Sequence, residues 1–200
     1  MTTPLRMTLL GVVSVLQLAA PASSIFRYES TLRTGVLYRI PTDAIDPADA
    51  FRGRYVAVQP TITMPEPIAR ETQDVLDRIQ TGEKGYVVLT ADANGIARAA
   101  DVRLDPPTQG DYLQIASAWP QMRDNPGEPN RPYVRVGYNL TFSFNRYYMN
   151  DAMAPQAERR MTESRPRNGE TRAWLAVKVK NGLGVIEGLY VDGVPIEKAQ

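Results

Sequence analysis

The chain has 200 residues, of which 43% are hydrophobic and 22% are charged, and its formal net charge is +1. A charge so close to zero creates no overall field that would recruit nucleic acid or acidic substrates. The sequence contains no cysteine and no histidine. Disulfides, Cys/His zinc sites and the serine or cysteine mechanisms that depend on a histidine are therefore excluded. We expect no catalytic residues, no metal site and no cofactor.

Residues 7–26 form an uncharged and mostly apolar segment between Arg6 and Arg27. As a helix rising about 1.5 Å per residue, a segment of this length spans the roughly 30 Å hydrocarbon core of a bilayer. We therefore predict a transmembrane anchor at 7–26, with residues 1–6 in the cytoplasm. Residues 27–200 would then form one exported domain on the periplasmic or extracellular side of the inner membrane.

Two alternatives for this segment stay open. Ala20-Pro21-Ala22 has the small-x-small form of a signal-peptidase site, so the segment could be a cleaved signal sequence. The proline at the centre of the triplet weakens that match. The segment could also be a helix buried in the core of the domain.

Eight segments of the remaining chain are predicted to be β-strands, because they are rich in β-branched and aromatic residues or alternate apolar with polar positions. The clearest alternation is at 133–144 (YVRVGYNLTFSF), which predicts an antiparallel strand with one buried face. Pro60 lies within 55–63 and makes that segment an edge strand, a bulge or two short strands. The predicted strands are residues 29–40, 55–63, 85–90, 96–104, 112–119, 133–144, 173–180 and 183–191.

Turns and two helices connect these strands. Asn94-Gly95 and Asn181-Gly182 are typical of tight hairpin turns. We predict helices at 67–80 and 150–163, and a polar loop at 120–132. Many short strands with one or two helices predict a mainly β (α+β) domain, arranged as a small, partly open antiparallel β-barrel or sandwich.

The segment from Asp46 to Val56 (DPADAFRGRYV) resembles the signature phrase of the GDYXXLXY proteins, a family of bacterial membrane-anchored proteins. Glu29 and residues 32–35 (LRTG) are similar to the family's juxtamembrane run. Residues 145–149 (NRYYM), followed by Glu158, are similar to its late motif of an arginine, paired aromatics and a glutamate. Further similar stretches follow in the family's order at 85–89, 95, 106–107, 110–113 and 184–193.

Within the motif that names the family, this chain has Arg54 where the family has Asp, Val58 where it has Leu, and Pro60 where it has the final Tyr. Any role of that aspartate is therefore lost here. The resemblance implies no particular activity. Some members of the family are encoded beside, or fused to, multi-spanning membrane proteins, so the resemblance implies a membrane-protein partner.

Charged residues in these matched stretches are the candidate site. Two guanidinium groups beside a glycine turn could bind a carboxylate or phosphate, and a wider arginine–carboxylate network could order the domain or line a ligand pocket. The structural alternative is a glycine turn at positive φ whose aromatic neighbours pack. The tentative ligand-binding residues are Arg52, Arg54, Arg146 and Glu158. The residues assigned to a structural motif are Asp46, Pro47, Phe51, Gly53, Tyr55, Glu29 and Arg33.

Two further sequence patterns suggest a metal site or a catalytic pair. Asp92, Asn94 and Gly95 resemble part of a calcium loop, but the bidentate glutamate is missing, so we predict a hairpin turn. A lysine could replace the missing histidine in a Ser-Lys hydrolase, and the candidate is Lys84, which immediately precedes the strand at 85–90. No serine has a motif context that marks it as a nucleophile.

The sequence therefore favours a membrane-anchored, non-enzymatic accessory or interaction domain that works with an integral membrane partner. A periplasmic small-anion or ligand-binding sensor domain is the alternative, and an exported hydrolase without histidine is a third. We expect no nucleic-acid partner, and the oligomeric state is left open.

Overall fold

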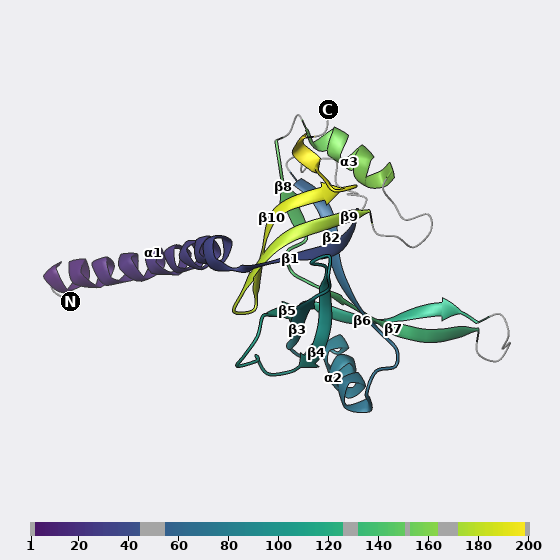
Figure 1. The fold of residues 1–200 in the computed structure, drawn as a ribbon. Helices are drawn as coiled ribbons and strands as arrows, with labels where there is room; N and C mark the ends of the chain where they lie inside the picture. The colour runs from purple at the N-terminus through teal and green to yellow at the C-terminus, as the bar shows by residue number, and fades with distance from the viewer. Residues whose placement is uncertain (1–2, 45–54, 126–131, 151–152, 164–171, 199–200) are drawn as a thin grey trace.

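The computed structural model describes residues 3–44, 55–125, 132–150, 153–163 and 172–198. A long helix, α1 (Thr3–Thr34), projects from one side of a mainly β domain, and a ribbon of β6 and β7 projects from the other side (Figure 1). The other elements are β1 (Val36–Ala44), β2 (Tyr55–Pro65), α2 (Arg70–Gln80), β3 (Gly85–Ala91), β4 (Ala97–Arg103), β5 (Tyr112–Ile115), β6 (Ser117–Asp124), β7 (Tyr133–Thr141), β8 (Arg146–Tyr148), α3 (Ala154–Glu163), β9 (Ala173–Lys180), β10 (Leu183–Val191), β11 (Val194–Pro195) and the 3-10 turn η1 (Ile196–Lys198).

Two antiparallel sheets make up the domain. The larger has the strand order β11-β10-β9-β1-β2-β7-β6, with β8 as a further partner of β2, and the smaller has the order β4-β3-β5. Backbone bonds join the sheets: the Arg39 N–H donates to the Gly95 carbonyl at 3.0 Å, and the Gln114 N–H donates to the Gly182 carbonyl at 3.1 Å. Among the described strands, the two ends of the larger sheet do not pair with each other. The prediction of a mainly β, antiparallel fold is confirmed, as an open arrangement rather than a closed barrel.

Pro60 lies inside a single continuous strand, β2, at the point where that strand changes partners. One edge of β2 pairs with β1, while its other edge pairs first with β8 at 55–57 and then with β7 at 61–65. The Val58 N–H donates toward the β8 side, to the Asn145 carbonyl at 3.1 Å. Since backbone groups two residues apart face the same side of a strand, Pro60 faces the gap between β8 and β7. Its missing N–H therefore leaves no partner unsatisfied.

The predicted strand at 29–40 is wrong in its first half, because α1 continues to Thr34 and β1 begins at Val36. No glycine or proline lies between Pro21 and Gly35, so nothing ends the helix before residue 34. The hydroxyl of Thr31 donates to the Arg27 carbonyl at 2.9 Å, as a helical threonine can. The alternation at 36–40 does form a strand, in which Tyr38 and Ile40 are buried.

The single strand predicted at 112–119 is two strands, β5 and β6, separated by a bend at Ala116. β5 pairs in the smaller sheet and β6 in the larger. The loop predicted at 120–132 is wrong in its first part, because β6 continues through Pro120 to Asp124. β6 is an edge strand, where proline is tolerated because one side needs no ladder hydrogen bond. Residues 126–131 lie outside the described residues.

The hairpin predictions are confirmed. Asn181 and Gly182 have φ of 49° and 79° between β9 and β10, as a type I′ turn requires. Gly95, with φ of 74°, lies in the connection from β3 to β4. Helices α2 and α3 end where predicted and begin three to four residues later than predicted.

One apolar core lies under both sheets and α2. The alternating segment at 133–144 contributes Tyr138, Leu140 and Phe142, as its pattern predicts. Fully buried side chains from other elements are Ile40, Val58, Leu76, Val87, Leu113, Leu175 and Leu189.

Candidate functional site at the helix–sheet junction

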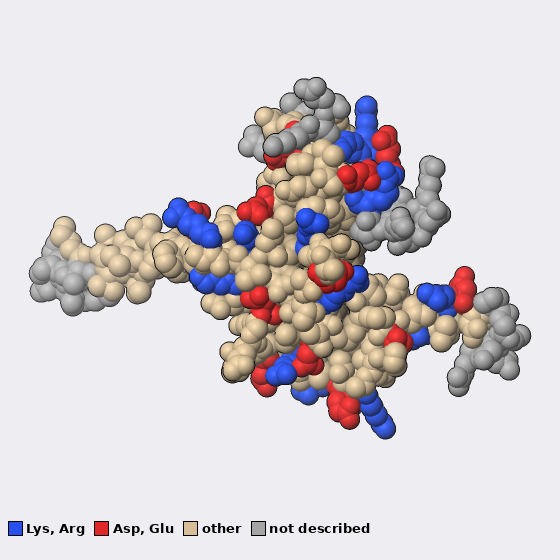
Figure 2. All heavy atoms as spheres, in the orientation of Figure 1, with Lys and Arg blue, Asp and Glu red and all other residues tan. Residues whose placement is uncertain are grey.

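The described residues contain one helix that is long and apolar enough to cross a membrane, Leu10–Thr34. None of its most apolar stretch is buried in the domain, so the alternative of a helix buried in the core is wrong. Figure 2 shows uncharged side chains along the shaft of α1 and basic side chains gathered where the helix meets the domain. By length and composition alone, such a helix near the N-terminus fits either an anchor or a signal sequence.

The last turn of α1 is tied to the β9–β10 hairpin by Lys180. The ammonium of Lys180 donates to Ser30 Oγ at 2.8 Å and to Thr34 Oγ1 at 2.7 Å. A positive charge at this position is also favoured by the negative end of the helix dipole. The Gly35 N–H donates to the Thr31 carbonyl at 2.8 Å, and β1 begins at the next residue. The helix therefore enters the sheet without a linker.

Gly35 permits this passage because the backbone approaches it closely. A Cβ at Gly35 would lie 2.5 Å from the Thr31 carbonyl oxygen and 3.0 Å from the Val179 carbonyl oxygen. A side chain at this position would push the last turn of α1 away from β9. The glycine in the predicted juxtamembrane run thus has a packing role.

A cleft of about 460 Å³ lies beside the junction, and we call it the junction cleft. It is lined by Tyr28 of α1, by residues 143–148 around β8 and by residues 183–186 at the start of β10. Most of the predicted late motif, including Arg146, therefore lines one hollow next to α1. Arg146, Tyr28 and Tyr148 are exposed in it.

The wall of the junction cleft is partly apolar and well ordered by packing. The rings of Phe142 and Phe144 stack with centroids 5.4 Å apart, and a Cβ at Gly184 would overlap the Phe144 ring. The Tyr147 hydroxyl donates to Glu197 Oε1 at 2.9 Å. Burial, and then this hydrogen bond, raise the pKa of Tyr147 above its usual value. Tyr147 is therefore a neutral hydrogen-bond donor throughout the physiological pH range.

The structure brings together some of the predicted site residues and leaves others outside its described parts. Arg33 and Glu29 form an exposed ion pair on α1, with Nε and Oε1 2.8 Å apart. Arg146 begins β8, and Tyr55 begins β2. Glu158 is on α3, but its side chain is not among those described. Also outside the described residues are Asp46, Pro47, Phe51, Arg52, Gly53 and Arg54.

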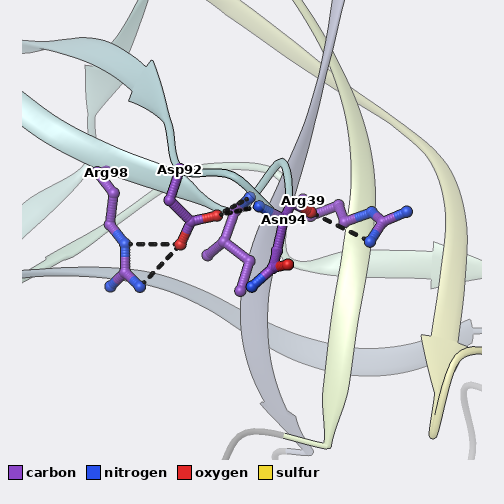
Figure 3. Close-up of polar contacts among 5 residues, drawn as sticks. Arg39, Asp92, Asn94 and Arg98 are labelled. Atoms are coloured by element: carbon purple, nitrogen blue, oxygen red, sulfur yellow. Dashed lines mark hydrogen bonds and ion pairs between the residues drawn. The ribbon is translucent and has the colours of Figure 1, made fainter.

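The Asp92 turn is a hairpin turn between β3 and β4, as predicted (Figure 3). Asp92 Oδ1 accepts the N–H groups of Asn94 and Ile96 at 2.9 and 3.0 Å. Its Oδ2 accepts from Nε and Nη2 of Arg98 at 3.2 and 3.0 Å. The Ile96 N–H, and then Arg98, lower the pKa of the Asp92 carboxyl. Among the described residues, no group of three acidic side chains could hold a metal ion.

Sequence reasoning missed the serine–lysine contact. Lys84 is exposed, whereas Lys180 lies 2.8 Å from Ser30 Oγ. A general base must accept the serine proton, but the Lys180 ammonium donates to two hydroxyls at once. These bonds hold the end of α1 against the β9–β10 hairpin. Ser30 and Lys180 are 150 positions apart, and no local pattern links them.

The fold and the junction define an open antiparallel β domain carried on an N-terminal apolar helix. The family model described as "GDYXXLXY protein" matches residues 17–189. The chain therefore belongs to the GDYXXLXY family, which confirms the resemblance noted in its sequence. Comparison with curated proteins and with solved structures gave no match. The matched range includes the last turn of α1 and the lining of the junction cleft.

Proposed function

We propose that α1 anchors this protein in a membrane and that the β domain is a non-enzymatic interaction domain working with an integral membrane partner. The linker-free junction carries the proposal. Lys180 bonds two hydroxyls of the last helical turn, and Gly35 passes directly from helix to sheet. A helix fixed in this way holds the domain at one orientation and close to the bilayer.

The junction cleft is the surface we propose for the partner. Tyr28 follows the predicted span by two residues, or about 3 Å along a helix, at the level where tyrosine is enriched in membrane proteins. Tyr28 and Tyr148 are 51% and 65% exposed. Aromatic and arginine side chains in a partly apolar hollow are the groups that dominate protein interfaces.

In this proposal residues 1–6 are cytoplasmic and residues 27–200 lie on the periplasmic or extracellular side of the inner membrane. The uncharged segment between Arg6 and Arg27 supports it. Alkaline phosphatase fused after residue 200 should be active and should sediment with membranes after a carbonate wash. An inactive fusion would contradict export, and an active fusion released into the soluble fraction would show a cleaved signal sequence.

Photo-crosslinking tests the partner surface. A benzophenone amino acid at Tyr148, introduced in the full chain in cells, should give an adduct with a multi-spanning membrane protein that also co-purifies in mild detergent. The matched control is the same substitution at Tyr133, which is 60% exposed on the β6–β7 ribbon. Equal adducts from both positions, or none from Tyr148, would rule out the junction cleft as the contact surface.

The position of Arg146 favours a second candidate function, a small-anion or ligand-binding sensor domain. Its exposed side chain lines the junction cleft beside Tyr148, where a guanidinium can form bidentate bonds to carboxylate or phosphate. Phosphate, sulfate and citrate would then raise the melting temperature of the wild type and of Arg123→Ala, which removes an exposed arginine of β6. The shift would be absent in Arg146→Ala. An equal rise in melting temperature in both variants would show that Arg146 does not form the anion-binding site.

A further inference from the structure

A second hollow of about 480 Å³ shares no lining residue with the junction cleft. It lies over strands β1, β2, β7 and β6 of the larger sheet and is bounded by the start of β4. We call it the sheet groove. Its volume falls in the range of about 300–1,000 Å³ that holds small ligands in proteins.

Strand register explains why polar side chains gather in the sheet groove. Thr63, Asn139 and Trp119 are opposite one another on β2, β7 and β6. The adjacent row, Ile62, Leu140 and Ala118, is buried in the core. Because successive side chains of a strand face opposite sides, the row that includes Asn139 is on the outer face. This face has hydroxyl and carboxamide groups where the inner face is apolar.

These polar groups have hydrogen-bonding capacity that the protein does not use. Thr63 Oγ1 donates to Asn139 Oδ1 at 2.9 Å, which fixes that carboxamide and leaves its two N–H groups as donors. In the described parts of the chain, the carboxamides of Gln59 and Gln121, which also line the groove, show no side-chain hydrogen bond. Both can donate to and accept from a ligand.

Arg98 bounds the sheet groove on the β4 side and is already oriented. Its guanidinium is held by the two bonds to Asp92 (Figure 3). The carboxylate compensates its charge, and among the described residues no other cation lines the groove. The site therefore does not favour an anion, and it lacks the row of phosphate-binding cations that nucleic acid requires.

Trp119 supplies the apolar wall of the sheet groove. It is 47% exposed on an edge strand, although tryptophan is highly buried on average. An indole ring beside several carboxamides and hydroxyls matches a ligand with one apolar face and a rim of hydroxyl groups. A pyranose ring has this form, with C–H bonds on its face and hydroxyls around its edge.

We propose that the sheet groove binds a neutral oligosaccharide. Trp119 stacks against the face of one sugar ring. The carboxamides of Asn139, Gln59 and Gln121 bind its hydroxyls, and Arg98 provides a further donor at the rim. Because the groove and the junction cleft share no residue, failure of either proposal leaves the other standing.

Tryptophan fluorescence of the full chain tests the proposal directly. The second tryptophan, Trp174, stacks on Tyr190 with ring centroids 4.1 Å apart, so Trp174→Phe keeps a stacked ring and makes Trp119 the sole reporter. The protein is kept in a zwitterionic detergent without a sugar headgroup. It is then titrated with cellotetraose, maltotetraose and chitotetraose. We expect a saturable change in Trp119 emission with at least one of them.

Variants assign the binding to the groove. These variants are made in the wild-type background, and binding of that oligosaccharide is measured by ligand-observed NMR. Trp119→Ala should weaken binding at least tenfold. Gln121→Ala should weaken it about threefold. Tyr133→Ala removes a similarly exposed aromatic from the same ribbon and should leave binding unchanged. Circular dichroism confirms that each variant is folded. No saturable change with any of the three sugars at 20 mM, or equal binding by folded Trp119→Ala and Tyr133→Ala, would overturn the proposal.

Discussion

The ammonium of Lys180 donates to the Thr34 hydroxyl at 2.7 Å, joining residues 146 positions apart in the sequence. The same ammonium bonds Ser30, one helical turn earlier. These contacts connect the end of α1 to the β9–β10 hairpin. No linker separates α1 from β1 along the chain. The orientation of the apolar helix is therefore a property of the folded domain.

Replacing Lys180 by methionine should loosen the end of α1. The substitution keeps an unbranched apolar chain but removes both hydrogen bonds and the charge at the helix C-terminus. We expect a loss of about 1–2 kcal/mol in the free energy of unfolding and faster hydrogen exchange at residues 30–35. Mass spectrometry of the full chain in detergent measures the exchange.

Lys178→Met is the matched control for Lys180→Met. Lys178 is on the same strand, and the described residues show no hydrogen-bond partner for its side chain. This variant should exchange at residues 30–35 as the wild type does. Equal protection of the last helical turn in the two variants would mean that Lys180 does not fix the helix.

Gly35→Ala should disrupt the passage from helix to sheet. The added methyl group would overlap the Thr31 carbonyl and press on the backbone of Val179. Overpacking of this kind costs about 1–3 kcal/mol, which thermal unfolding in detergent would show as a lower melting temperature. Gly11→Ala adds the same methyl group to α1 with nothing within 4 Å and should cause no loss. If both variants melt at the same temperature, the close approach at Gly35 is not maintained.

Local patterns predicted most of the fold. Asn181 and Gly182 both have positive φ, and Gly95 has positive φ in the other Asn-Gly turn, because the turn chemistry is contained in one or two residues. Tyr138, Leu140 and Phe142 are buried because alternation alone decides which side of a strand faces the core. The family motifs also located Arg146, which lines the junction cleft.

Tertiary contacts decided the features that sequence patterns could not predict. The local sequence of residues 29–34 is compatible with a helix or a strand. Lys180 stabilises the helix through its bond to Ser30, which is 150 positions away in the sequence. The bend at Ala116 follows from two different sheets recruiting β5 and β6. The sheet groove depends on the register of three strands. The polar half of the alternation at 133–144, which includes Asn139, was the available signal for it.

Tyr38→Phe should alter the response of the protein to alkaline pH. The Tyr38 hydroxyl donates to Asp111 Oδ2 at 3.0 Å. Burial, and then Asp111, raise the pKa of Tyr38 to about 12, against about 10 in an unfolded chain. A raised pKa contributes stability that is complete below pH 10. That stability is lost as the pH rises through 12, because the unfolded chain ionises first.

We therefore expect Tyr38→Phe to be less stable than the wild type by about 1 kcal/mol at pH 7–9, from the lost hydrogen bond. The free energies of unfolding of the two proteins should converge between pH 10 and 12. Over this range the Tyr38 hydroxyl ionises in the unfolded wild type but stays neutral in the folded wild type, and phenylalanine has no such group. Urea unfolding at each pH measures the difference. Tyr133→Phe, at an exposed ring, should follow the wild type throughout. A constant gap between Tyr38→Phe and the wild type up to pH 12 would contradict the assignment.

Asp92→Asn should alter the response to acid. The pKa of the Asp92 carboxyl is lowered, first by the Ile96 N–H and then by Arg98. A lowered pKa contributes stability that is present above the unfolded value, about 3.9, and is lost as the pH falls through the folded value.

Asparagine keeps an oxygen for the turn N–H groups but removes the charge that binds Arg98. The melting temperature of Asp92→Asn should therefore lie below that of the wild type at pH 7, and the gap should close below pH 4. Asp105→Asn removes an exposed carboxylate just after the end of β4 and should melt with the wild type at both pH values. A gap for Asp92→Asn that is as large at pH 3 as at pH 7 would show that the charge on this carboxylate does not stabilise the hairpin.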